Sequence, residues 1–171
     1  TANQVWNNKQ LLSSNIPTWA HLMGAAGYET YLIGRMHFEG PDQRHGFQYR
    51  PLTEPFAQYP GGSPKGGPVW TKVPAATNAQ RRESVEIAGK GRTVHQWYDE
   101  QVAEQACRFL STQAKRQHAP FAAVVGFILP HCPFVAPEEL FDYYYDRIDI
   151  PEVERSQPRS VTRLRQYRRI L

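Results

Sequence analysis

The spacing of apolar residues in the first third of the chain predicts one helix followed by one strand. Between Pro17 and Gly27, apolar side chains recur with the period of one helix face: Trp19, Leu22, Met23 and Ala26. Pro17 suits the first turn of a helix, and Gly27 is typical of the position just past its end. The run that follows, over residues 28–33, predicts a buried strand.

The second half of the chain repeats this order of helix and strand. A helix is predicted from Tyr98, with acidic residues in its first turn. Its apolar face comprises Val102, Ala106, Phe109 and Leu110. Residues 121–129 are continuously apolar, as expected of a central parallel strand buried on both faces. Further helices are predicted from Pro137 and over 160–171, and the order of elements is typical of a parallel α/β sheet.

The stretch over about 51–92 has a different composition from the rest of the chain. Its many prolines and its paired glycines exclude long regular structure. The aromatic residues Phe56, Tyr59 and Trp70 argue against a disordered linker, because disordered segments are poor in aromatics. Since loops of this length inside a compact domain are usually functional, we predict an ordered lid or interface loop.

Composition and charge argue against a membrane or a nucleic acid as the partner of this chain. Hydrophobic residues make up 40% of the chain, and no apolar run approaches the ~20 residues that span a bilayer, so no membrane partner is predicted. The net charge is +4, with many arginines over 155–169. Only Tyr167 is interleaved with them, which favours a solvated helix face over a nucleic-acid interface. Cys107 and Cys132 fit neither a disulfide framework nor a zinc motif, and Cys107 is predicted to be a small core residue.

The candidate chemistry begins immediately after the first predicted strand, in Gly34-Arg35-Met36-His37. Arg35 and His37 lie two positions apart and would point in the same direction. Open α/β sheets bind ligands at the carboxyl ends of their strands, so both side chains would face a crevice. A guanidinium suits an oxyanion, and an imidazole can donate a hydrogen bond or shuttle a proton.

A second histidine, His131, follows the second predicted strand and is flanked by Pro130 and Pro133. If the two strands are parallel neighbours, His131 emerges at the same sheet edge as Arg35 and His37. Together these groups suit a sulfate or phosphate ester. The alternative is that Arg35 is a surface charge and His131 an ordinary loop histidine.

Two motifs, one after each predicted strand, resemble those of the sulfatase family in the alkaline-phosphatase superfamily. The first is Gly-Arg-Met-His-Phe-Glu-Gly-Pro-Asp-Gln-Arg-His-Gly-Phe, over 34–47, and its sequence is similar to that found in the choline-sulfatase-like branch of the family. The second, Pro-Phe-x-x-x-Val-x-Phe-x-x-Pro-His-x-Pro-Phe, begins at Pro120. The resemblance covers most of the chain except about 51–92. It implies an α/β fold in which residues 1–171 form part of the N-terminal catalytic domain, with a doubly wound, mainly parallel sheet, flanking helices and a loop excursion at 51–92.

The resemblance also implies roles for three residues. Arg35 stands where sulfatases usually have a lysine that contacts the sulfate, so the charge is kept while the geometry changes. His37 stands at a catalytic histidine on the nucleophile side of the site. His131 stands at a catalytic histidine that binds the sulfate and assists the leaving group. No metal ligand is implied in this chain.

Sulfatases hydrolyse their substrates with a formylglycine made from Cys or Ser, and they bind a divalent cation, usually calcium. Neither Cys107 nor Cys132 is followed by the formylglycine motif, and no aspartate pair stands in a suitable context. The resemblance therefore implies an internal segment of a full-length parent that supplies both groups, and the segment alone is expected to be inactive.

The implied partner is a small-molecule or carbohydrate sulfate ester. A phosphonate monoester or phosphodiester hydrolase of the same superfamily, and a non-catalytic anion-binding module, are the alternatives. A homo-oligomer is compatible with the sequence, and no cellular compartment is indicated.

Overall fold

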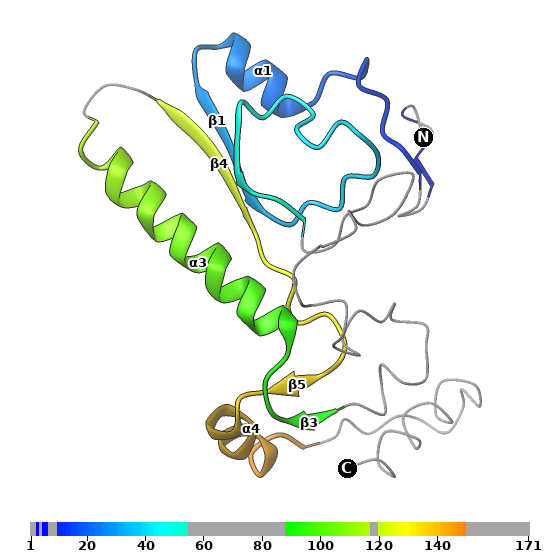
Figure 1. Cartoon of the computed structure of the whole chain (residues 1–171), viewed down its shortest axis with the longest axis vertical. Helices are drawn as coiled ribbons and strands as arrows, with labels where there is room; N and C mark the ends of the chain where they lie inside the picture. Colours follow the sequence, from blue (N-terminus) through cyan, green and yellow to red (C-terminus); the bar gives the residue numbers. More distant parts are fainter. Residues whose placement is uncertain (1–2, 4, 7–9, 55–87, 117–119, 150–171) are drawn as a thin grey trace, which may run out of the picture. The chain divides into compact units, whose positions relative to one another are not determined.

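The computed structural model describes residues 3, 5–6, 10–54, 88–116 and 120–149 (Figure 1). The chain divides into two compact units. The first comprises Thr1–Pro68 and Tyr98–Ile128, and the second comprises Val69–Trp97 and Leu129–Leu171.

The first unit contains a parallel sheet of three strands: β1 (Glu29–Gly34), β2 (Tyr49–Leu52) and β4 (Phe121–Gly126). Their order is β2-β1-β4, and both neighbours of β1 run parallel to it. The strands β1 and β4 pair without a register shift from Glu29–Phe121 to Gly34–Gly126. The two strands whose ends carry the candidate residues are thus direct neighbours, and their carboxyl ends coincide at Gly34 and Gly126.

Helices pack on both faces of this sheet. On one face, Ala20 of α1 (Trp19–Ala25) forms a buried cluster with Leu32 and Phe47. On the other face, Tyr31, which alternates with Leu32 along β1, packs against Phe109 of α3 (Val94–Gln113), with ring centroids 4.4 Å apart and the rings tilted by 46°. Figure 1 shows α1 and α3 on either side of β1 and β4. The predicted α/β fold with flanking helices is confirmed.

The second unit contains a short parallel pair, β3 (Gly89–Lys90) and β5 (Val135–Ala136), followed by α4 (Glu138–Tyr145). Lys90 Nζ lies 2.5 Å from Asp142 Oδ1, so a salt bridge joins β3 to α4. The side chain of Gln96 donates from Nε2 to Val135 O at 2.8 Å. These polar contacts hold the strand pair to the helical segments around it.

Several elements differ from the predicted pattern. The helix expected from Tyr98 already begins at Val94, and short strands occupy both ends of the range 51–92. Strand β4 ends at Gly126, and Val125 within it is 39% exposed, so the expected burial on both faces is wrong for the described part of the chain. A continuous apolar run does not reveal how many layers cover a strand.

Cys107 was predicted to be a core residue, and this is wrong, because it is exposed on α3. Its small side chain sits next to the buried Ala106 on the boundary between the covered and the solvated face of the helix. The helix predicted over 160–171 and residues 55–87 of the predicted loop lie outside the described residues. Among the helices that are described, none combines the length and apolarity needed to cross a bilayer.

Candidate functional site

The carboxyl end of β1 is held in close contact with the end of β4. Arg35 N donates to Gly126 O at 2.9 Å, which extends the ladder one residue beyond β1. A Cβ atom at Gly126 would lie only 1.8 Å from Arg35 O, so no side chain fits there. Gly34 adopts φ 95°, a left-handed conformation that glycine tolerates best. The chain therefore turns sharply at Gly34 and presents Arg35 at the end of the sheet.

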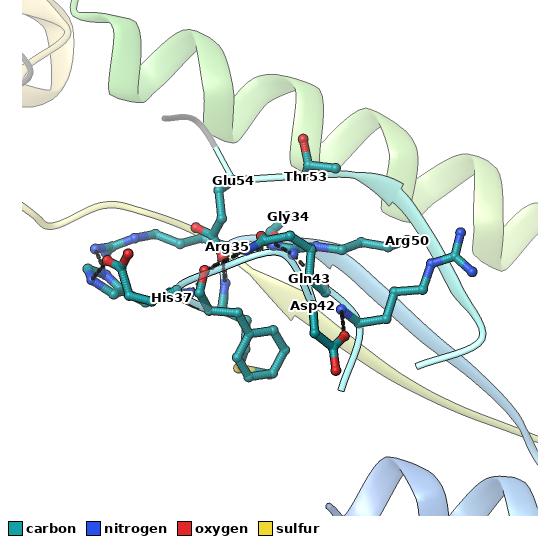
Figure 2. Close-up of polar contacts among 12 residues, drawn as sticks. Gly34, Arg35, His37, Asp42, Gln43, Arg50, Thr53 and Glu54 are labelled. Carbon is teal, nitrogen blue, oxygen red and sulfur yellow. Dashed lines mark hydrogen bonds and ion pairs between the residues drawn. The ribbon is translucent and has the colours of Figure 1, made fainter. Parts of the chain in front are cut away.

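Arg35 and His37 are brought together, as Figure 2 shows. Arg35 Nη2 lies 2.8 Å from His37 Nδ1. A guanidinium has only donors, so Nδ1 accepts this hydrogen bond and the ring proton of neutral His37 is on Nε2. Glu39 Oε1 lies 3.8 Å from that Nε2. The pair thus combines a fixed positive charge with an imidazole whose Nε2–H is a donor.

A buried ion pair lies next to this segment, and sequence reasoning missed it. Arg50 of β2 and Glu54 just beyond it are 2% and 3% exposed, with Nη2 and Oε1 2.8 Å apart. Both contact the segment that carries Arg35 and His37 (Figure 2). Their spacing of four residues was a signal, but β2 lay in a stretch interpreted as loop.

Asp42 and His45 stabilise the turn that follows. Asp42 Oδ1 accepts from the backbone N–H groups of Arg44 and His45, each at 3.0 Å. Burial opposes ionisation of Asp42, but these backbone donors and the Ser14 hydroxyl lower its pKa to about 2. Burial lowers the pKa of His45, whose ring nitrogen Nδ1 lies 3.3 Å from Asp42 Oδ2. The side chain of His45 is 1% exposed, which suits a structural role.

His131 belongs to the second unit, between the cis peptide bonds Leu129–Pro130 and Cys132–Pro133. Its Nδ1 lies 2.8 Å from Cys132 O, and since a carbonyl only accepts, Nδ1 carries a proton. The ring packs edge-on against His95, with centroids 5.8 Å apart. His95 is 1% exposed, and sequence reasoning missed it because it lay before the predicted start of the helix. The approach of His131 to Arg35 and His37 stays a prediction.

Comparison with known proteins shows the family of the chain. The sequence model of the sulfatase family, described as Sulfatase, matches residues 1–167. The chain belongs to the sulfatase family. A choline-sulfatase from Rhizobium meliloti (strain 1021) is 34% identical over 148 residues, which cover 84% of this chain. The chain spans 28% of the length of that relative. The resemblance inferred from the two motifs is confirmed.

Sulfatases generally use a divalent cation and a formylglycine, and the described residues fit neither group. No cluster of three or more His, Cys, Asp or Glu side chains able to hold a metal ion occurs within the described ranges. Cys107 and Cys132 lack the motif that directs formylglycine formation. The described residues thus include no set of ligands for the cation and no precursor of the formylglycine.

Proposed function

We propose that the complete protein containing this chain hydrolyses a sulfate ester, and that this chain supplies the groups that bind the sulfate and help the leaving group. The contact between Arg35 Nη2 and His37 Nδ1, 2.8 Å at the end of β1, supports this most directly. It places a permanent charge and an Nε2–H donor at the sheet edge where α/β proteins bind ligands.

Arg35 is the proposed partner of the sulfate oxygens. Charge-assisted hydrogen bonds from a guanidinium to an oxyanion are short and strong, and the planar fork adds directional preference. The contact with His37 uses an N–H of Nη2, and the guanidinium carries further donors for the ester. His37, with its proton on Nε2, is proposed to donate a hydrogen bond on the nucleophile side.

His131 is proposed to protonate the departing alkoxide. Its Nδ1 already donates to Cys132 O at 2.8 Å, so the proton for a leaving group comes from Nε2 of the doubly protonated ring.

The test is hydrolysis by the complete protein of matched sulfate and phosphate esters. Choline sulfate is the first ester to try, because a choline-sulfatase is 34% identical to this chain, and an aryl sulfate is the second. We expect sulfate to be released, with kcat/KM higher for the sulfate ester than for its phosphate analogue. A preference for the phosphate or phosphonate ester supports the sister activity, and binding of inorganic sulfate without any turnover supports an anion-binding module.

The 171-residue segment by itself is proposed to be inactive. Purified segment assayed beside the complete protein, with an Arg35→Met segment as the control for contaminating enzyme, is expected to release no sulfate. Turnover that Arg35→Met abolishes would contradict this proposal.

A further inference from the structure

The proposed chemistry leaves the buried ion pair between Arg50 and Glu54 unexplained. The two side chains are 2% and 3% exposed. Taking two charges out of water costs several kcal/mol for each ion, and their attraction offsets this only when further hydrogen bonds satisfy both groups. The hydrogen bonds that these two side chains make therefore indicate what the pair stabilises.

Glu54 holds the backbone of the segment that carries the candidate site. Its Oε1 accepts from Met36 N at 2.8 Å and from His37 N at 2.6 Å (Figure 2). Successive N–H groups that converge on one anion form a concave binding site for it. His37 adopts φ 60°, a left-handed conformation that is unfavourable for a non-glycine residue. The carboxylate stabilises this conformation and so determines the direction in which the His37 side chain leaves the backbone.

Arg50 holds the same segment at both of its ends. Its Nη2 donates to Gly34 O at 3.2 Å, next to the start of the segment. Its Nη1 donates to Gln43 O at 2.6 Å and to Gln43 Oε1 at 2.8 Å. Gln43 in turn donates from Nε2 to Phe38 O at 2.7 Å and Gly40 O at 2.8 Å. Arg50 and Gln43 thus close the loop around Arg35 and His37.

The residue before Glu54 is itself held by α3. The hydroxyl of Tyr98 donates to Thr53 O at 2.7 Å, and Tyr98 is 2% exposed. Burial raises the pKa of Tyr98 far above its ordinary value, and the charge of Glu54 raises it further, so the hydroxyl keeps its proton. The chain is therefore held to α3 at Thr53 and to Arg50 of β2 at Glu54.

We propose that Glu54 is a positioning residue for the sulfate-ester reaction, acting through the backbone of His37 to keep that ring against Arg35, with Arg50 and Gln43 as its supports. This inference rests on the proposed function. It differs from a purely structural role because the hydrogen bonds of Glu54 end on the backbone of His37 itself and of Met36, which lies between Arg35 and His37.

The test uses Glu54→Ala and Glu54→Gln in the complete protein. Alanine removes the acceptor, and misplacement of a catalytic group by about 1 Å can cost about 100-fold in rate, so we expect kcat/KM to fall about 100-fold. Glutamine keeps an acceptor oxygen and is expected to restore activity to within about tenfold of wild type. Glu104→Gln is the matched control, because Glu104 also pairs with an arginine four residues away, Arg108, but is 48% exposed.

A double-mutant cycle separates positioning from stability. If Glu54 acts through His37, the variant carrying both Glu54→Ala and His37→Asn has nearly the kcat/KM of His37→Asn alone. If Glu54 acted on stability alone, Glu54→Ala would only lower the fraction of folded protein. The losses of kcat/KM from the two substitutions would then multiply in the double variant, and this result would overturn the proposal. The cycle of Glu104→Gln with His37→Asn is expected to be additive, with no loss from Glu104→Gln.

A crystal structure of Glu54→Ala supplies a readout that does not depend on activity. We expect Arg35 Nη2 and His37 Nδ1 to move beyond hydrogen-bonding distance, and retention of the 2.8 Å contact would overturn the proposal. If the wild-type protein hydrolyses no sulfate ester, the proposed function fails while this distance still decides the positioning claim. Where Glu54→Ala does not fold, Gln43→Ala takes its place with the same expected direction and a smaller displacement.

Discussion

The two candidate histidines follow neighbouring parallel strands, but their neighbours fix a proton on opposite ring nitrogens. His37 Nδ1 accepts from Arg35 at 2.8 Å, so its Nε2 carries the proton and acts as a donor. His131 Nδ1 donates to Cys132 O at 2.8 Å, so its Nε2 is the atom that gains and loses a proton. The difference teaches that the hydrogen-bond partner of Nδ1 decides what Nε2 can do. At His37 the partner makes Nε2 a hydrogen-bond donor, and at His131 it leaves Nε2 as the site of proton exchange.

The two strand ends are also held by different means. The segment after β1 is bound by the buried side chains of Arg50 and Glu54, which come from a distant part of the sequence. His131 contacts its neighbour Cys132 and the ring of His95. Substitutions of Arg50 or Glu54 should therefore act on the site through the backbone of the segment after β1.

The largest effect is expected at Arg35, which supplies the positive charge at the end of β1 and fixes the tautomer of His37. Arg35→Met should lower kcat/KM of the complete protein for a sulfate ester about 10³-fold, because the oxyanion loses its fixed positive charge. Arg35→Lys keeps the charge and should stay within about tenfold of wild type. Steady-state kinetics on both variants measures this, and a near-normal Arg35→Met would show that the guanidinium does not bind the ester.

The next effect is expected at Gly126, where the backbones of the two strand ends touch. Gly126→Ala should lower the free energy of unfolding by about 3 kcal/mol or more, because its Cβ would lie 1.8 Å from Arg35 O. Gly24→Ala is the control, since Gly24 lies in α1 with Gln48 Nε2 as the nearest atom at 3.9 Å. That substitution should stabilise by up to about 1 kcal/mol. Denaturant unfolding measures both, and equal midpoints for the two variants would be inconsistent with a close approach at Gly126.

His131→Asn tests whether His131 supplies the proton for the leaving group. It should lower kcat about 100-fold for an alkyl sulfate, because the departing alkoxide needs a proton. For an aryl sulfate with an acidic phenol, which leaves without one, kcat should fall by less than about tenfold. Equal losses on both esters would instead indicate that His131 only binds the sulfate.

The smallest effect concerns the stability of the first region in acid. The pKa of Asp42 is lowered to about 2 from 3.8, and burial lowers that of His45 from 6.5, so both groups bind fewer protons in the folded state. Each group contributes its full stabilisation above its unfolded pKa, and this contribution is lost as the pH is lowered. The contribution of His45 is lost first, below pH 6.5, and that of Asp42 is lost between pH 3.8 and about 2. Asp42→Asn should remove about 1 kcal/mol of the loss in the lower window, after allowing for screening at a side chain 32% exposed. Thermal unfolding from pH 5 to pH 2 measures this, and parallel curves for both proteins would contradict it.

The sequence was sufficient for the elements whose signal is local. The apolar period of α1, the glycine at position 27 and the run ending at Ile33 predicted one helix and one strand close to their observed bounds. Two motifs at strand ends predicted the family, and Arg35 and His37 were found because a short spacing in one strand exit places them together.

The parts that sequence reasoning missed depend on contacts between distant segments. Arg50 and Glu54 contact residues 34–43 only because β2 pairs with β1, and β2 is a short strand at the edge of a proline-rich stretch. His95 reaches His131 only in the folded second unit. The burial of β4 was misjudged because an apolar sequence does not show which neighbours cover it.

The central claim is that Arg35, His37 and His131 serve one sulfate group. A crystal structure of the complete protein with bound inorganic sulfate tests it most directly. We expect sulfate oxygens within about 3 Å of the guanidinium of Arg35 and of Nε2 of His131, with the His37 ring still against Arg35. A sulfate held by other residues, or His131 tens of ångströms from Arg35, would contradict the claim.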